Sequence, residues 1–316
     1  MSSNYQGKHV ARTHRVLLFT AAAVVLILAV AAAVLIYQRF QKNNPRTSSP
    51  PPGSSAVQSA AGNTSADLRQ TAEPTEPPPP PYDFSQPVPE GEEVDNSYFD
   101  DAAFVGDSRT DGFMLYSGIG TGDNLSANGV SIFKLADRKS LTIDGEKYTA
   151  LEALALKEYG KVYIALGVNE LGYNNDKGYY NKFCAAIDEI RRVQPNAVIY
   201  IQGLIPVNEE QYLAATGHDY LTNDHLRVYN QLMRQVAEEK KVAYIDVYEA
   251  FVDENGALPE EDSRDGVHLY KESCQRWLAY LKTHTVDFDT LYPDGPPAVE
   301  PAEPTGTDTS TADGSG

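Results

Sequence analysis

The sequence has few of the residues that build disulfide frameworks or metal clusters. Among 316 residues there are only two cysteines, Cys184 and Cys274, and six histidines. Both cysteines lie far apart in stretches with helical periodicity, so we expect two buried free thiols rather than a disulfide. The His-Asp and Asp-His pairs at residues 218–219 and 224–225 lack a second cluster that would complete a metal site. The sequence therefore excludes a disulfide-stabilised scaffold, and we expect neither a metal nor a cofactor.

Positive charge is also scarce. The chain has 26 Lys and Arg against 44 Asp and Glu, which gives a net charge of −18. Much of this acidity lies in the flanks: residues 285–316 contain no Lys or Arg, and residues 60–101 contain only Arg69. No basic patch of the kind that nucleic acid requires is evident in the sequence between these flanks. We therefore expect no nucleic-acid partner.

One long apolar run is present, at residues 16–37, and it carries no charge (VLLFTAAAVVLILAVAAAVLIY). A helix needs about 20 apolar residues to cross a bilayer. The apolar part of a cleaved signal peptide is shorter, about 7–15 residues. The run therefore predicts a single membrane-spanning anchor, although its Ala-rich end leaves a cleaved signal as the alternative.

Composition divides the chain into five parts. Residues 1–15 form a short basic N-terminus, and residues 16–37 form the anchor. Residues 38–96 are rich in Pro, Ser and Thr and too poor in apolar residues to fold, which predicts a disordered stalk. Residues 97–290 can form one folded domain, and residues 291–316 are a low-complexity acidic tail. We expect a single-pass protein of the cell membrane with an extracytoplasmic domain; the alternative is a linker that faces the cytoplasm.

The folded part alternates apolar strands with amphipathic helices. Strand candidates lie at residues 103–106, 128–135, 161–167, 197–207 and 242–248, and helix candidates at residues 179–193, 223–241 and 271–283. This alternation predicts an α/β protein: a three-layer α/β/α sandwich with a mainly parallel sheet of about five strands. In such sheets a site forms where the strands end at their carboxyl edge.

Chemically useful side chains follow two of these strands or precede the last helix. Ser108 comes after the first strand, Asn169 after the third, and Asp265 and His268 lie in the loop before the final helix. A serine hydroxyl becomes a nucleophile when a histidine takes its proton. A carboxylate orients that histidine, and hydrogen-bond donors stabilise the oxyanion. The set predicts acyl transfer through a serine.

In order and spacing, these residues resemble the SGNH, or GDSL-type, hydrolase family. The blocks are Gly-Asp-Ser at residues 106–108, Gly129, Gly-x-Asn at residues 167–169 and Asp-x-x-His at residues 265–268. The resemblance covers nearly all of residues 100–285. Each block is weak alone, and the four together are fairly specific.

The resemblance implies a flavodoxin-like SGNH hydrolase fold and a role for each residue. Ser108 is implied as the nucleophile, His268 as its base and Asp265 as the carboxylate that orients the base. The oxyanion hole is implied to consist of the Ser108 N–H, the Gly129 N–H and the Asn169 side chain. The family pattern implies neither a metal nor a cofactor.

The sequence departs from the family pattern in two places and leaves one assignment open. Arg109 replaces the leucine of the signature, and we expect it to affect the entrance of the site, by guiding an anionic polymer, or else to brace the turn. Glu170 replaces an aspartate, and we expect a structural change only. The glycines of residues 117–124 compete with Gly129, although that stretch has the composition of a mobile loop.

Two further groups of side chains invite alternative interpretations. Asp246 is a rival carboxylate that we expect to brace a loop. Several tyrosines are expected in loops or edges near the site, where they could stack on sugar rings: Tyr173, Tyr179, Tyr180, Tyr212 and Tyr220.

The hypothesis is a membrane-anchored extracytoplasmic serine esterase that removes a small acyl group, acetyl above all, from a cell-surface glycan or related polymer. Its substrate would be such an acylated polymer or a small ester. One alternative is an O-acyltransferase acting on surface polysaccharide, and another is a catalytically silent surface binding domain.

Overall fold

The structure, a computed structural model, describes residues 80–298. The predicted N-terminus and anchor, most of the predicted stalk and the end of the acidic tail lie outside these residues. Between residues 80 and 298, the helices are too short or too polar to cross a bilayer.

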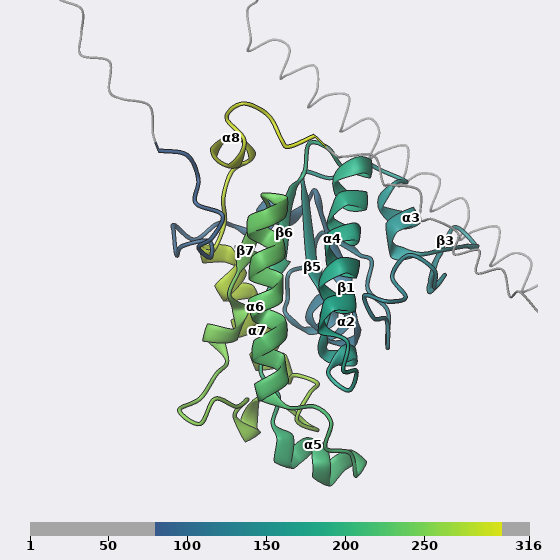
Figure 1. The fold of residues 1–316 in the computed structure, drawn as a ribbon, viewed down its shortest axis with the longest axis vertical. Coiled ribbons are helices and arrows are strands. Elements are labelled where there is room, and N and C mark those ends of the chain that lie inside the picture. The colour runs from purple at the N-terminus through teal and green to yellow at the C-terminus, as the bar shows by residue number, and fades with distance from the viewer. Residues whose placement is uncertain (1–79, 299–316) are drawn as a thin grey trace, which may run out of the picture. The chain divides into compact units, whose positions relative to one another are not determined.

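Five parallel strands form the central sheet, in the order β2-β1-β5-β6-β7 (Figure 1). The strands are β1 (Ala102–Gly106), β2 (Asp123–Asn124), β5 (Lys161–Ala165), β6 (Val198–Gln202) and β7 (Ala243–Ile245). All four neighbouring pairs are parallel. The predicted five-stranded parallel sheet is confirmed.

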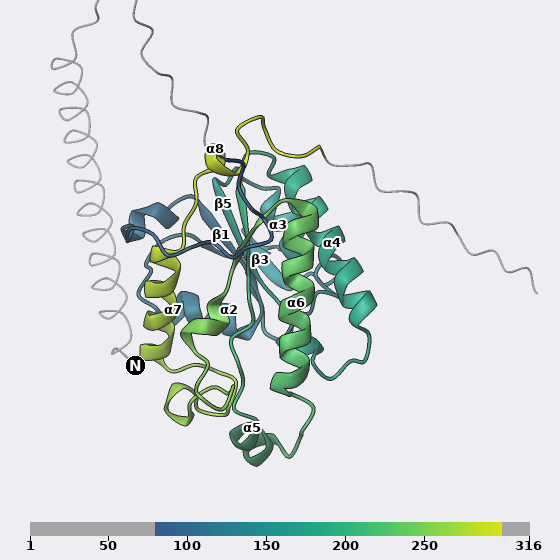
Figure 2. The same ribbon diagram turned by 60° about the vertical axis from the view of Figure 1, so that its left-hand side comes forward.

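Helices cover both faces of this sheet. On one face lie α2 (Ser108–Tyr116) and α7 (Lys271–Thr283), which pack against each other. On the other lie α3 (Ala150–Leu154), α4 (Asp176–Val193) and α6 (Asn223–Lys240). Figure 2 shows the sheet between α7 on one side and α4 and α6 on the other. The predicted three-layer α/β/α arrangement is therefore confirmed for the described residues.

Shorter elements connect these layers. They are a hairpin of β3 (Leu141–Ile143) and β4 (Glu146–Tyr148), the helices α5 (Glu209–Thr216) and α8 (Phe288–Leu291), and the 3-10 turns η1 (Asn96–Phe99), η2 (Val168–Glu170), η3 (Val247–Ala250) and η4 (Glu260–Asp262).

Side chains alternate between the two faces along each central strand, as the pleat of a sheet requires. Phe104, Tyr163 and Tyr200 belong to the core under α2 and α7. Their rings are stacked, with centroids 4.9 Å apart for Phe104 and Tyr163 and 4.6 Å apart for Tyr163 and Tyr200. Val162 and Ile164 belong to the core under α4 and α6. Both cores are thus built by the same short strands.

The strand predicted at residues 128–135 is wrong. These residues form turns, in which Val130 N–H donates to Ala127 O and Lys134 N–H donates to Ser131 O. The strand beside β1 is instead β2, just before this stretch. The long strand predicted at residues 197–207 ends at Gln202. Gly203 N–H still donates to Ile245 O of β7 over 2.8 Å, but beyond it side chains take the backbone donors: Leu204 N–H bonds to Asn230 Oδ1.

The packed part of the chain extends beyond residues 97–290 at both ends. Val88 is buried, and its N–H donates to Tyr244 O over 2.8 Å. Gly91 N–H donates to Thr283 O over 2.7 Å. Beyond residue 290, Leu291 is buried as well. The Pro-rich composition before residue 97 therefore hides a segment that is tied to β7 and α7 by backbone hydrogen bonds.

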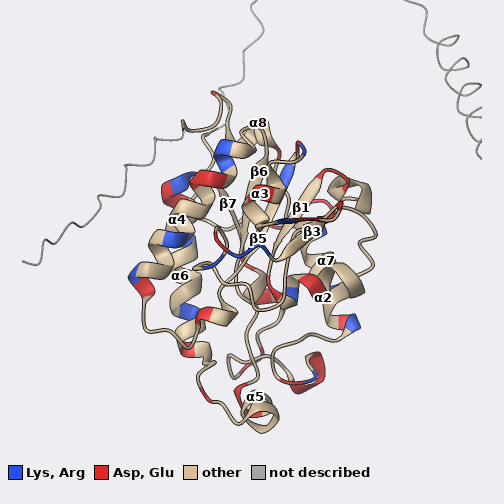
Figure 3. Ribbon diagram, turned by 90° about the vertical axis from the view of Figure 1, so that its right-hand side faces the viewer, with Lys and Arg blue, Asp and Glu red and all other residues tan. Residues whose placement is uncertain are grey.

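Charges on the outer helices are mixed in sign. Figure 3 shows acidic and basic residues interspersed along α4 and α6. On these helices Arg192 pairs with Glu189 and Lys240 pairs with Asp188. Their cations are thus neutralised locally rather than gathered into a single-signed face.

Candidate active site

The turn that presents Ser108 depends on a glycine and an aspartate. Ser108 is the first residue of α2, and Asp107 caps this helix by accepting the Arg109 N–H over 2.9 Å. A Cβ on Gly106 would overlap the Thr110 hydroxyl and approach Ala165 O to 2.9 Å. Glycine is therefore required for β1 to run this close to α2 and β5.

Ser108 Oγ lies within hydrogen-bond distance of a histidine from the far end of the chain. The distance from Ser108 Oγ to His268 Nε2 is 3.0 Å, and that from His268 Nδ1 to Asp265 Oδ2 is 2.9 Å. Because an ionised carboxylate only accepts, Nδ1 carries the proton and Nε2 is free to accept from the serine hydroxyl. The structure thus joins the three residues in one hydrogen-bonded chain.

Asp265 is held in its ionised form by the loop that contains it. Partial burial alone would raise its pKa. The N–H groups of His268 and Val267 and the His268 ring act against burial and lower the pKa of Asp265 to about 2. The loop turns at Gly266, where φ is +81°. A Cβ there would overlap Asn208 O. Asp265 is therefore a carboxylate throughout the neutral range.

The loop after β5 turns at a second glycine and presents Asn169. Gly167 has φ of +151°, and a Cβ there would lie 2.7 Å from the Tyr179 hydroxyl. In the following turn, Asn169 Nδ2 donates to Val130 O over 2.8 Å. An amide nitrogen has two hydrogens, so one remains available beside this bond. Asn169 is thus tied to the segment that contains Gly129.

Glu170 also contacts the segment that contains Gly129, through a hydrogen bond. Its side chain is completely buried, and one carboxyl oxygen accepts the Ile132 N–H. The other oxygen, Oε2, has no hydrogen-bond partner among the described residues. Burial, with a smaller repulsion from Asp107, raises the pKa of Glu170 to about 8. Glu170 is therefore mostly a neutral acid at pH 7, and it differs from an ordinary surface carboxylate.

Gly129 lies on the correct edge of the sheet, and the competing glycines do not. Gly129 follows β2, with φ of +67°, and its carbonyl accepts Arg138 Nη1 over 2.9 Å. Residues 117–122 precede β2, at the opposite end of that strand. Asn96 Nδ2 bonds to two carbonyls of this earlier loop, at 3.1 Å and 2.9 Å. A glycine N–H from residues 117–122 is thus at the wrong edge to face Ser108.

Sheet topology explains why these loops meet. From β1 the chain first adds β2 on one side and later adds β5 on the other. The loops that follow β1 and β5 therefore diverge at a topological switch point, where open parallel sheets form their sites. Ser108 comes from the first loop and Asn169 from the second.

Arg109 lines the cleft over Ser108, but its guanidinium is not free there, so the expectation that it guides an anionic polymer is wrong. Its side chain is buried and donates to three backbone carbonyls, those of Val267, Ile205 and Pro206. The alternative expectation, that Arg109 braces the turn, fits these contacts. Composition could not reveal this role, because arginine is usually a surface residue.

A cleft of about 610 Å³ opens over Ser108 and His268, between α2 and the start of α7. Three exposed apolar or aromatic side chains line it: Leu115, Tyr116 and Tyr270. The sequence interpretation missed these residues. Leu115 and Tyr116 follow Ser108 by about two helical turns, and Tyr270 follows His268 by two residues. This closeness in sequence could have indicated that they line the site.

Most of the tyrosines expected near the site are not free to form a platform. Tyr179 is buried and stacks on Tyr229, with ring centroids 3.9 Å apart. Tyr212 is buried as well, and Tyr180 bonds to Glu239. The structure therefore contradicts a carbohydrate platform built from that set as a whole.

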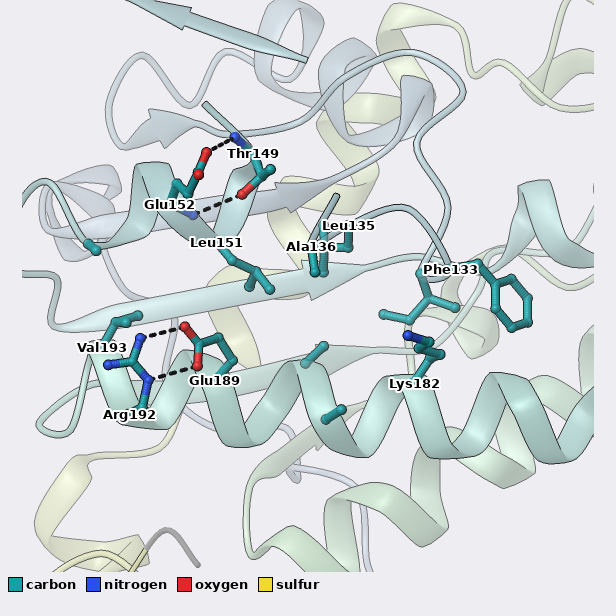
Figure 4. A pocket seen from close by; sticks show the side chains of 14 residues that line it. Phe133, Leu135, Ala136, Thr149, Leu151, Glu152, Lys182, Glu189, Arg192 and Val193 are labelled. Carbon is teal, nitrogen blue, oxygen red and sulfur yellow. Dashed lines mark hydrogen bonds and ion pairs between the residues drawn. The ribbon is translucent and has the colours of Figure 1, made fainter. Parts of the chain in front are cut away.

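A second cavity, of about 500 Å³, lies between α3, α4 and residues 132–136 (Figure 4). Its walls are largely apolar, with Leu135 and Leu151 among them, and Glu189 and Arg192 pair at one end. None of the three hydrogen-bonded residues of the Ser108 site lines it. Ile132, which lines this cavity, donates its N–H to Glu170, the residue that follows Asn169.

The remaining candidates have structural contacts. Cys184 and Cys274 are both free thiols, as predicted, but only Cys274 is fully buried; Cys184 is half-buried. Asp246 pairs with Arg234 of α6, in agreement with a bracing role. His225 is held by Leu171 O at 2.9 Å and by Asp176 Oδ1 at 2.8 Å.

Comparison with known proteins identifies the family of most of the described residues. Residues 104–296 match the GDSL-like Lipase/Acylhydrolase family. No match was found among curated proteins. Among solved structures, the chain is similar to a Streptococcus pneumonia protein named for platelet activating factor (24% identity, TM-score 0.48, covering 61% of this chain and 84% of that one). It is also similar to a GDSL-like lipase from Bacteroides thetaiotaomicron VPI-5482 (16% identity, TM-score 0.43, 59% and 87%). A third similar structure is a peptidoglycan O-acetylesterase (20% identity, TM-score 0.40, 51% and 45%).

Proposed function

The chain belongs to the GDSL-like lipase/acylhydrolase family of ester-hydrolysing enzymes, and on this premise we propose that it is a membrane-anchored serine esterase that removes a small acyl group from a cell-surface glycan. One observation carries the chemistry: Ser108 Oγ, His268 and Asp265 form a continuous hydrogen-bonded chain, with distances of 3.0 Å and 2.9 Å. This is the arrangement that activates a serine for attack on an ester carbonyl.

In the first half of the reaction, Ser108 Oγ attacks the ester carbonyl carbon while His268 Nε2 takes the hydroxyl proton. Asp265 stabilises the imidazolium that forms and keeps the ring in the correct tautomer. The tetrahedral intermediate then collapses, and the ester C–O bond breaks. The proton on His268 passes to the leaving alcohol, which leaves an acyl group on Ser108. Water, activated by His268, releases this group as a carboxylic acid.

The oxyanion of the intermediate needs donors that are not already used. Ser108 is the first residue of α2, so its N–H has no acceptor within the helix. We assign the other two donors to the Gly129 N–H and to the second hydrogen of Asn169 Nδ2. Both belong to loops already joined by the bond from Asn169 to Val130 O. Loss of one such donor costs about 10²–10³-fold in kcat in other hydrolases.

The cleft supports a polymer substrate with a small acyl group. Tyr116 and Tyr270 are 52% and 44% exposed, so their rings can stack on sugar faces outside the reacting centre. Arg264 and Lys271 also line the cleft, together with Asp111, so charges of both signs lie near it. We therefore propose an acetylated glycan, with the anchor at residues 16–37 holding the domain at the extracytoplasmic surface.

Activity on short and polymeric esters tests this function. Purified full-length protein should hydrolyse p-nitrophenyl acetate and release acetate from acetylated glycans, and Ser108→Ala should be inert on both. Ser117→Ala, a buried serine at the far end of α2, is the matched control and should retain activity. Equal activity of Ser108→Ala and the wild type would refute the proposed nucleophile. If acetate appears on an added acceptor sugar rather than in water, the enzyme is a transferase with the same triad.

The surface location has its own test. Protease added to intact cells should release residues 80–298 if the domain faces outward. Complete protection of the domain in intact cells, with cleavage after lysis, would show that it faces the cytoplasm.

A further inference from the structure

Arg109 is a buried cation directly after the proposed nucleophile. Its side chain is 6% exposed. The guanidinium donates three hydrogen bonds to backbone carbonyls: Nε to Val267 O at 2.8 Å, Nη1 to Ile205 O at 2.6 Å and Nη2 to Pro206 O at 2.9 Å. Each bond ends on a residue almost a hundred or more positions away along the chain. Arg109 therefore joins three segments at one point.

These carbonyls belong to two segments, and the positions of these segments relative to Ser108 determine the geometry of the proposed triad. Val267 immediately precedes His268, the base that faces Ser108. Ile205 and Pro206 belong to residues 203–208, the segment that follows β6, which is buried up to residue 207. The same segment contacts the His268 loop again, because Asn208 N–H donates to Gly266 O over 2.9 Å. Arg109 thus connects the Ser108 turn to the His268 loop, both directly and through residues 203–208. We call this set of hydrogen bonds the bracket.

Arginine suits this position better than any other residue. A guanidinium presents five N–H donors in a rigid planar fork, whereas a lysine ammonium is a point charge on a flexible stem. Leucine could donate no hydrogen bond here and would leave three buried carbonyls unpaired. Burial lowers the pKa of Arg109 to about 10, and the nearby Asp107 and Asp265 act against this decrease. The guanidinium therefore remains charged at neutral pH beside the Asp107 carboxylate.

We propose that Arg109 is a positioning residue that fixes the His268 loop relative to Ser108 and thereby sets the distance across which the serine proton moves. The inference rests on the proposed roles of Ser108 and His268. Arg109 acts through these residues and not on the substrate. A displacement of about 1 Å in a catalytic group can cost about 10²-fold in rate. Loss of Arg109 should therefore lower kcat and leave KM nearly unchanged.

Two substitutions and a matched control test this role in the full-length protein. Arg109→Lys keeps the charge but not the fork, and Arg109→Leu restores the leucine of the family signature. Arg191 is the control, because it is equally buried and also donates to two carbonyls, those of Lys240 and Lys241, at the end of α6. Arg191→Lys should lower Tm and leave kcat for p-nitrophenyl acetate within about twofold of wild type.

The readouts are kcat, KM and amide hydrogen exchange, measured well below the Tm of each variant. We expect kcat to fall by about tenfold in Arg109→Lys and about 10²-fold in Arg109→Leu at constant KM. Exchange should accelerate in residues 262–270, while α4 and α6 stay protected. Wild-type kcat in both folded Arg109 variants would overturn the inference. So would a loss of kcat with unchanged exchange in residues 262–270.

Folding and the proposed chemistry are separated by two further measurements. If neither Arg109 variant folds, amide hydrogen exchange of the wild-type protein tests the inference. The amides of Gly266 and His268 should then be as protected as that of Asn208. Rapid exchange of the His268 loop alone would refute the bracket. Ser108→Ala tests the proposed function separately. If Ser108→Ala is active, the proposed function fails. If it is inert while Arg109→Lys has wild-type kcat, only the positioning role fails.

Discussion

Replacement of Glu170 by glutamine should remove a pH-dependent loss of stability that is built into the site. Glu170 is completely buried, and one of its oxygens lacks a partner among the described residues. Burial raises its pKa from 4.5 to about 8, so the folded protein retains a proton that the unfolded chain loses. The free energy of unfolding must therefore fall as pH rises through this interval.

The size of the effect follows from that interval. A pKa difference between 4.5 and about 8 corresponds to about 5 kcal/mol over the full range, at about 1.4 kcal/mol per unit. Between pH 6 and pH 8 the expected loss from Glu170 is about 2 kcal/mol, because the folded state begins to ionise near pH 8. Asp107, also buried, has a pKa raised to about 6 and contributes mainly below this window.

Urea unfolding of wild type and Glu170→Gln at pH 6, 7 and 8 measures this difference. Glutamine keeps the carbonyl that accepts the Ile132 N–H but buries an amide, so the variant carries a constant cost of about 1–3 kcal/mol. The slope with pH is therefore the decisive quantity, and it should be shallower in Glu170→Gln by about 2 kcal/mol across the window. Glu189→Gln is the control: the hydrogen bond from Arg192 lowers the pKa of Glu189, which titrates well below pH 6. Parallel slopes for wild type and Glu170→Gln would show that Glu170 is ionised in the folded protein and would refute the reasoning.

Other substitutions test the turns and the triad. Gly106→Ala should destabilise the fold by about 1–3 kcal/mol in urea unfolding, because its Cβ would overlap the Thr110 hydroxyl; wild-type stability would contradict that close approach. Gly167→Ala should be destabilised in the same assay, since its φ is +151° and its Cβ would meet Tyr179. Asp265→Asn should lower kcat by about 10⁴-fold with little change in KM, and a KM effect alone would exclude an orienting role. Asp265 should also stabilise the fold above its ordinary pKa of 3.8, with that stability lost only as pH falls toward about 2; acid unfolding of wild type against Asp265→Asn measures this loss.

Regular elements with a strong local pattern could be predicted from sequence. The helix predicted at residues 271–283 matches α7. The strand predicted at residues 161–167 begins where β5 begins and ends two residues beyond it. The apolar stretch at residues 128–135 misled, because its backbone donors satisfy local turns and the distant Glu170 carboxylate rather than a neighbouring strand. No local pattern reveals an acceptor so far away in sequence.

One short element had a clear signal that the sequence interpretation did not use. The hairpin of β3 and β4 turns on Asp144 and Gly145, which have φ of 51° and 87°. An Asp-Gly pair that joins two extended segments is a strong indication of a two-residue hairpin with positive φ at both positions. The information was local, and turn chemistry would have found it.

The site also has parts that the sequence could predict and parts that it could not. Ser108, Asn169, Asp265 and His268 could be located because each follows a strand or precedes a helix, and parallel topology brings such loops to one edge. The contacts that hold those loops together could not be located. Arginine is usually a surface residue, so the sequence offered no reason to expect Arg109 in the interior. Its role depends on backbone carbonyls of residues 203–208, which the sequence does not distinguish from any others.

Residues 203–208 therefore connect the parts of the site more than any of the motif residues does. Their carbonyls accept Arg109 from the Ser108 turn, and the Asn208 N–H holds Gly266 in the His268 loop. Buried backbone groups must be paired, so a chain that ends a strand early has to find such partners. The premature end of β6 at Gln202 is thus what leaves carbonyls free for Arg109. The neighbouring strands β5 and β7 end at Ala165 and Ile245, so the carbonyls that follow β6 have no strand to pair with and accept Arg109 instead, which ties the Ser108 turn to the His268 loop.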